Sequence, residues 1–87
     1  MMNNKVLIKL FVPELDVSFD CFVPVNELIW KIKILLVKAV TDLTNTDYGK
    51  RQNYILINRN TSEVYPNNVT LIQTNIRNAS ELILMSE

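Results

Sequence analysis

The chain of 87 residues contains no histidine, one cysteine and one glycine. Without histidine it lacks the usual general base, the Ser–His nucleophilic dyad and the commonest metal ligand. Cys21 alone forms neither an internal disulfide nor a zinc site, and Gly49 alone makes no Gly-rich phosphate loop. These absences argue against an enzyme and predict no catalytic residue, cofactor or metal site.

Two pairs of acidic residues and the single thiol are the remaining candidates for chemistry. Glu14 with Asp16, and Asp42 with Asp47, fall in polar turns, and we interpret them as solvated turn residues rather than catalytic carboxylates. Cys21 lies on the inward face of an expected strand with no basic residue nearby in the sequence, so we interpret it as a small core residue rather than a reactive thiol.

No excess of charge and no long apolar run is present either. Nine basic and nine acidic residues cancel, which argues against a nucleic-acid partner. No apolar run reaches the roughly 18 residues of a membrane span, so we expect no direct membrane insertion. The first five residues lead directly into an expected strand without the pattern of a signal peptide. We therefore expect one cytoplasmic domain over residues 1–87.

Alternating and continuous apolar segments predict the strands. Lys5–Val12 and 16–23 each alternate and are separated by a proline-containing turn, which predicts a hairpin. Tyr54–Asn58 predicts a third strand and 64–65 a short fourth one. The apolar run 82–85 is too short for a helix and predicts a buried final strand.

One long helix is expected over 28–41, with Asn26 as its N-cap. Its predicted core face is broad and contains Leu28, Ile29, Ile32, Leu35, Leu36, Ala39 and Val40. A separate apolar strip, formed by Trp30, Ile34 and Val37 at spacing i, i+4, i+7, is not needed to cover a small sheet.

The closing segment suggests the fold. Leu71 and Ile76 stand five apart in a polar stretch, which predicts a short one-turn element with two core anchors. The stretch from Thr70-Leu71 through Asn75-Ile76 and Ser80 to Leu82 and Leu84 resembles the end of ubiquitin-like domains in its spacing. Together with the order of the elements, it predicts an α+β protein with a ubiquitin-like β-grasp: a mixed four- to five-stranded sheet packed on one α-helix, with the last strand beside the first.

Two apolar surfaces are candidates for binding a protein partner. On the outer face of the sheet we expect Leu7, Leu56, Ile83 and Met85 to come together, with Tyr54 at the rim; the alternative is that they are scattered surface residues. On the helix we expect Trp30, Ile34 and Val37 to form a second surface, with Trp30 its main contact; the alternative is that the 41–53 connection covers it.

Within ubiquitin-like proteins, the chain resembles the YukD/EsaB family of small bacterial proteins encoded with type VII (WXG-type) secretion systems of Gram-positive bacteria. The residues that carry the resemblance are Phe19-Asp-Cys-Phe-Val-Pro24 and Val25-Asn-Glu-Leu-Ile29, which opens the helix. The chain departs from the family in a longer, more polar turn at 59–63. The resemblance implies a cytoplasmic accessory or regulatory protein that docks on the secretion machinery at the membrane, and it supplies no catalytic residues.

The first hypothesis is thus a non-conjugated binding protein of type VII secretion. Conjugated modifiers and sulfur carriers end in Gly-Gly, whereas this sequence ends Met85-Ser-Glu87, so we expect neither conjugation nor thiocarboxylation. A modifier or sulfur-carrier relative, and an adaptor unrelated to secretion, remain the alternatives. A homodimer through either apolar surface is a further one.

Overall fold

A computed structural model of the chain describes residues 4–50 and 53–87. The start of the N-terminal segment and residues 51–52 of the expected 41–53 connection lie outside the described residues. The predicted hairpin is confirmed: β1 (Lys5–Val12) and β2 (Val17–Pro24) pair antiparallel without interruption, from Lys5 opposite Pro24 to Val12 opposite Val17. A 3-10 turn over Pro13–Leu15 joins them, followed by Asp16 in the left-handed region with φ 52°.

The predicted helix exists, but its ends differ from the prediction. Helix α1 covers Ile29–Thr44, and its N-cap is Leu28, without a side-chain capping bond, rather than Asn26. Backbone carbonyls from a distant segment satisfy its first turn instead: Ile29 N–H donates to Val69 O over 2.9 Å. Helix starts leave such N–H groups unpaired, so a tertiary contact replaces the local cap that the sequence suggested.

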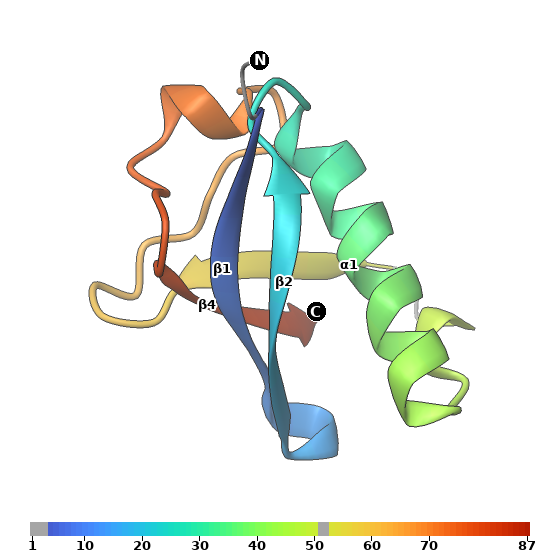
Figure 1. The fold of residues 1–87 in the computed structure, drawn as a ribbon. Coiled ribbons are helices and arrows are strands. Elements are labelled where there is room, and N and C mark those ends of the chain that lie inside the picture. Colours follow the sequence, from blue (N-terminus) through green and yellow to red (C-terminus); the bar gives the residue numbers. More distant parts are fainter. Residues whose placement is uncertain (1–3, 51–52) are drawn as a thin grey trace.

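The sheet has four strands in the order β2-β1-β4-β3, where β3 is Tyr54–Asn58 and β4 is Glu81–Ser86 (Figure 1). Strand β4 runs parallel to β1 and antiparallel to β3, so the last strand does lie beside the first in the middle of the sheet. The expected strand at 64–65 is only an isolated bridge between Val64 and Ile57. This arrangement confirms the α+β ubiquitin-like β-grasp.

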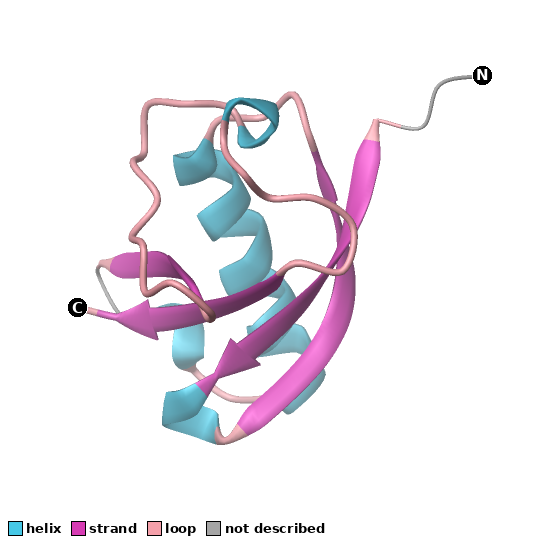
Figure 2. Ribbon diagram, turned by 90° about the vertical axis from the view of Figure 1, so that its left-hand side faces the viewer, coloured by secondary structure: helices cyan, strands magenta, loops and turns pink. Residues whose placement is uncertain are grey.

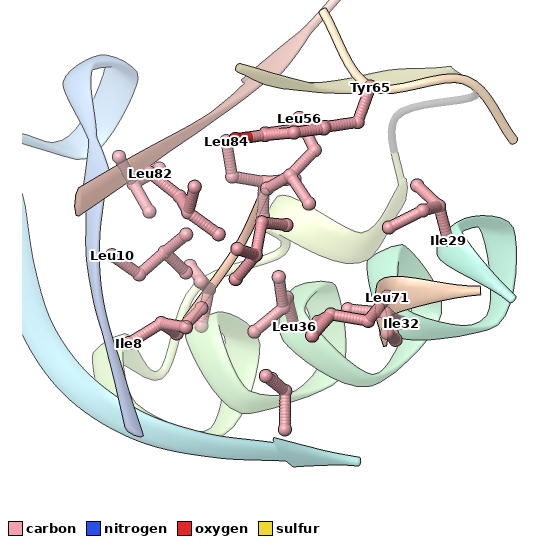
Figure 3. Packing of buried hydrophobic residues seen from close by; sticks show 14 of the residues in the cluster. Ile8, Leu10, Ile29, Ile32, Leu36, Leu56, Tyr65, Leu71, Leu82 and Leu84 are labelled. Carbon is pink, nitrogen blue, oxygen red and sulfur yellow. The ribbon is translucent and has the colours of Figure 1, made fainter. Parts of the chain in front are cut away.

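The core lies between α1 and one face of the sheet (Figures 2 and 3). The helix contributes Ile29, Ile32, Leu36 and Val40, each at most 1% exposed. Leu35 is 48% exposed, so its prediction as a core residue was wrong. The predicted anchors Leu71 and Ile76 are both buried, and Leu71 opens a 3-10 turn, Leu71–Gln73, with a capping box between Thr70 and Gln73. In the part of the chain that the structure describes, no helix has the length and apolar character needed to cross a membrane.

Candidate protein-binding surfaces

The outer face of the sheet, opposite α1, carries a row of apolar side chains on three adjacent strands. Ile83 on β4 stands between Phe11 on β1 and Ile57 on β3, and Met85 is paired with Ile55. All five side chains are partly exposed, whereas residues that alternate with them on the same strands are buried, among them Leu10, Val12, Leu56, Leu82 and Leu84. We call this set, Phe11, Ile55, Ile57, Ile83 and Met85, the outer patch.

The outer patch differs from the predicted sheet surface, and the prediction for Leu56 was wrong. Leu56 is paired with Leu84, and both side chains are fully buried under the helix. Every residue from Tyr54 to Ile57 is apolar, so the sequence showed no alternation to identify the outward residues. Ile55 and Ile57 take the place that was assigned to Leu56.

Leu7 shares the outer face but is not part of the outer patch. It pairs with Phe22 on β2, whereas Phe11 lies two steps further along β1, beyond Lys9. Lys9 is flanked by Asp20 on β2 and by Glu81 on β4, so a charged row separates Leu7 from the patch. Only Ile83 and Met85 of the four predicted residues therefore come together.

Arg59 forms one border of the outer patch. Its guanidinium lies 5.0 Å from the centre of the Phe11 ring, and its Nη1 is 4.0 Å from Glu81 Oε1. Beside it lies a hollow of about 210 Å³, lined by Lys9, Leu10, Ser18, Phe19, Asp20, Arg59 and Glu81. The outer face thus offers an apolar area next to balanced charges, an arrangement typical of a protein interface.

Tyr54 does not form the rim of the sheet surface, because it has the parity of Leu56. Its ring centre lies 5.2 Å from that of Tyr48 at an angle of 52°, and its hydroxyl donates to the Tyr48 carbonyl oxygen. The side chain is directed to the helix side of the sheet, so Tyr54 belongs with the second predicted surface.

That second surface is an open groove of about 390 Å³ beside α1. We call it the helix groove; its lining residues are Trp30, Lys33, Ile34, Val37, Gly49, Asn53, Tyr54, Asn67 and Glu87. Trp30 is 41% and Ile34 59% exposed. Val37 is partly buried, and a methyl group added to Gly49 would lie 3.6 Å from Val37 Cγ1. Gly49, in the 45–50 part of the connection, therefore lies close to Val37, whereas Trp30 and Ile34 stay exposed.

Charges at the helix groove are paired or held in place. Lys33 Nζ donates to Tyr54 O over 2.8 Å, and burial lowers the pKa of this amine while the nearby Glu87 carboxylate acts in the opposite direction. Lys31 lies 5.6 Å from the centre of the Trp30 ring and 3.9 Å from Glu27. The groove therefore suits an apolar side chain of a protein partner better than a strongly charged ligand.

Cys21 and Glu14, two of the candidate groups for chemistry, have surroundings that indicate a structural role. Burial and the neighbouring Asp20 raise the pKa of Cys21, which is the opposite of what an activated thiol requires. Glu14 is not simply a solvated turn residue: its carboxylate accepts hydrogen bonds from Tyr48 Oη over 2.8 Å and from Ser86 N–H over 3.1 Å. Among residues 4–50 and 53–87, no three His, Cys, Asp or Glu side chains are grouped so that they could hold a metal ion.

No protein-family model matches this chain, and no curated protein sequence matches it. Solved structures resemble it in shape. The EccD5 ubiquitin-like domain from Mycobacterium xenopi superposes with a TM-score of 0.79 at 14% identity, covering 98% of this chain and 97% of that one. A chain of the MycP5-free ESX-5 inner membrane complex gives 0.80 at 13% identity, and the match covers 98% of this chain but only 21% of that one. A chain of the toluene 4-monooxygenase HD complex with 4-bromobenzoate gives 0.71 at 10% identity, covering 95% and 99%.

The chain is therefore a domain of the ubiquitin-like β-grasp class. It is similar in shape to the EccD5 ubiquitin-like domain and to part of a chain of the ESX-5 inner membrane complex, and identities of 14% and 13% show the fold alone. Chains of this shape also occur in a monooxygenase complex, so the fold by itself does not decide the function.

Proposed function

We propose that this protein is a non-conjugated ubiquitin-like accessory or regulatory protein of a bacterial type VII secretion system. It is not an enzyme; it acts in the cytoplasm by binding a protein of the secretion machinery at the membrane. The resemblance of residues 19–29 to the YukD/EsaB family supports this proposal. So does the likeness in shape to EccD5 and to a chain of the ESX-5 inner membrane complex, since ESX-5 is a type VII system.

The observation that carries the binding role is the outer patch. Five partly exposed apolar side chains from three adjacent strands form one continuous area on the face that the helix does not cover. Contiguous apolar areas on a small domain mark interaction sites more often than single exposed residues do. The Arg59 guanidinium lies over the Phe11 ring, and both Phe and Arg are enriched at protein interfaces.

The test is capture of secretion components from detergent-solubilised membranes of the source bacterium, identified by mass spectrometry. The test variant is Ile57→Lys with Ile83→Asp. These two residues face each other across β3 and β4, so the double variant replaces an apolar pair by an ion pair and keeps the sheet paired. We expect the wild type to capture the secretion ATPase or its membrane partners, and the variant to lose them.

Ile72→Asp is the matched control, because Ile72 is 52% exposed and lies outside both surfaces. It should capture as well as the wild type. Equal capture by the double variant would disprove the outer patch as the contact. Capture of no secretion component by the folded wild type would disprove the secretion role itself.

Two measurements separate the alternatives. Incubation with a ubiquitin-type activating enzyme and ATP should give no adenylate; formation of one would favour a modifier or sulfur carrier. Gene neighbourhood distinguishes an unrelated adaptor: membrane ATPase and WXG genes beside this gene would favour secretion, and their absence would favour the adaptor.

A further inference from the structure

The hydrogen bonds of β1 determine which backbone groups of β2 face the outer edge of the sheet. Leu7 N–H donates to Asn78 Oδ1 over 2.9 Å, Leu7 O accepts from Ala79 N–H over 2.7 Å, and Lys9 N–H donates to Ser80 O over 2.9 Å. These partners all lie on the β4 side of β1. Because successive residues of a strand direct their backbone groups to opposite sides, the even-numbered residues of β1 face β2.

The uninterrupted pairing of β1 with β2 then shows which backbone groups of β2 bond to β1 and which face outward. Each even residue of β1 stands opposite an odd residue of β2, so the odd residues bond to β1 and the even residues point away from the sheet. The bond from Val25 N–H to Asn4 O over 2.8 Å continues the same alternation. The N–H and C=O groups that face outward therefore belong to Ser18, Asp20 and Phe22.

No strand or bridge of the described residues pairs with this edge. The contact of Cys21 Sγ with the outward Phe22 O, over 3.9 Å, is weak. The opposite edge of the sheet, on β3, is partly paired. Asn58 N–H donates to Glu63 O over 2.8 Å, and Tyr65 N–H donates to Leu56 O over 3.0 Å. The 63–65 segment thus covers part of β3.

Proteins normally protect a free edge with a short strand, a bulge, charged side chains, a proline or a covering segment. Strand β2 has eight residues, pairs with β1 without a bulge, and has its proline only at the last position, so Asp20 is the one charge among its outward residues. It therefore offers three outward residues at alternate positions as an open template for another strand.

We propose that this edge, Ser18, Asp20 and Phe22, binds an extended segment of a partner protein by strand addition, with a basic side chain of that segment opposite Asp20. The Asp20 side chain is exposed on the outer face, and Phe22, two positions along, is 62% exposed. Cross-strand pairs of opposite charge and of apolar residues stabilise a sheet. The preferred segment therefore carries Lys or Arg and an apolar residue at positions i and i+2.

A second copy of the chain fits this edge less well. Only one antiparallel register pairs all three outward residues, with Ser18 opposite Phe22 and Asp20 opposite its own copy. Two carboxylates directly opposite each other destabilise a strand pair. Any other register of β2 against itself forms fewer backbone bonds, so charge favours a different, basic partner.

The first test is selection from a displayed library of random nine-residue peptides, followed by binding of the enriched peptides to variants of the full chain. We expect enriched peptides to alternate and to carry Lys or Arg. Asp20→Pro removes one outward N–H and blocks the edge without removing a bond to β1, and it should weaken binding at least about tenfold. Asp20→Asn keeps the backbone donor and should weaken binding only about two- to fivefold.

Amide hydrogen exchange of the wild type tests the same edge without any substitution. In the free protein, the amides of Ser18, Asp20 and Phe22 should exchange on the order of a hundredfold faster than those of Phe19 and Cys21. Addition of an enriched peptide should protect the first three.

Four results would overturn the proposal. These are an absence of enriched peptides, equal binding by a folded Asp20→Pro variant, protection of the outward amides in the free monomer, and a concentration-dependent dimer that Asp20→Pro abolishes. The last would show that a second copy occupies the edge. The outer patch involves β1, β4 and β3 but not β2, so these results are independent of the capture experiment.

Discussion

Leu56 and Ile57 are neighbours in the sequence with opposite environments. Leu56 is fully buried against the helix side of the sheet, whereas Ile57 is partly exposed on the outer face and bridges to Val64. Deleting a buried methylene costs transfer free energy and leaves a cavity, while a half-exposed side chain has less area to lose. The two residues therefore differ in energetic role although their chemistry is similar.

Leu56→Ala should lower the free energy of unfolding by about 2–5 kcal/mol, and Ile57→Ala by about 1 kcal/mol or less. Urea unfolding followed by far-UV circular dichroism gives both values. Equal losses, or a larger loss at Ile57, would contradict the register of β3 against β4.

At the scale of elements, Glu14 connects three segments that are distant in the sequence. It lies in the 3-10 turn between β1 and β2, and its carboxylate accepts hydrogen bonds from Ser86 at the end of β4 and from Tyr48 in the 48–50 turn. Tyr48 is only 1% exposed, and its ring packs against Tyr54. One turn residue thereby fixes the connection that follows α1 and the end of the central strand.

Glu14→Ala should destabilise the domain by about 1–3 kcal/mol, because it leaves the Tyr48 hydroxyl and the Ser86 N–H without this charged acceptor. Thermal unfolding measures the loss, and amide exchange should accelerate at Ser86. Asp16→Asn in the same turn is the control, with a loss below about 0.5 kcal/mol. A fully stable Glu14→Ala variant would show that the carboxylate does not contribute.

At the scale of the whole molecule, the two candidate binding surfaces and the β2 edge lie on different sides of one small core. The outer patch is on the face opposite the helix, and the helix groove is beside α1. Strands β2 and β3 form the two edges of the sheet (Figure 1). The three share no residue, although the Cα radius of gyration of the domain is only 12.1 Å.

Trp30 is the only tryptophan, so its emission reports on the helix groove. Because it is 41% exposed, we expect red-shifted emission that acrylamide quenches and that does not change with protein concentration. Sedimentation over the same concentrations checks the oligomeric state. A blue shift that accompanies dimer formation would show that the groove pairs with a second copy, and blue emission of a monomer would contradict an open groove.

The sequence by itself determined the class of fold and most of its elements. The alternation of Lys5–Val12 and the helical spacing that ends in Val40 each follow from local periodicity. Because burial imposes that periodicity on any strand or helix, these elements could be predicted without the structure. The YukD/EsaB resemblance likewise depended on a short run of residues.

Only the tertiary structure decided which apolar residues of β3 face outward. In the continuous run from Tyr54 to Ile57, parity is set by pairing with β4, so the sequence could not distinguish Leu56 from Ile57. The start of α1 could not be predicted either, because the carbonyl of the distant Val69 stabilises it. The free edge of β2 follows from the strand order, which is also a property of the tertiary structure. Register, caps made by distant carbonyls and strand neighbours depend on contacts between segments far apart in the chain, and local composition does not encode them.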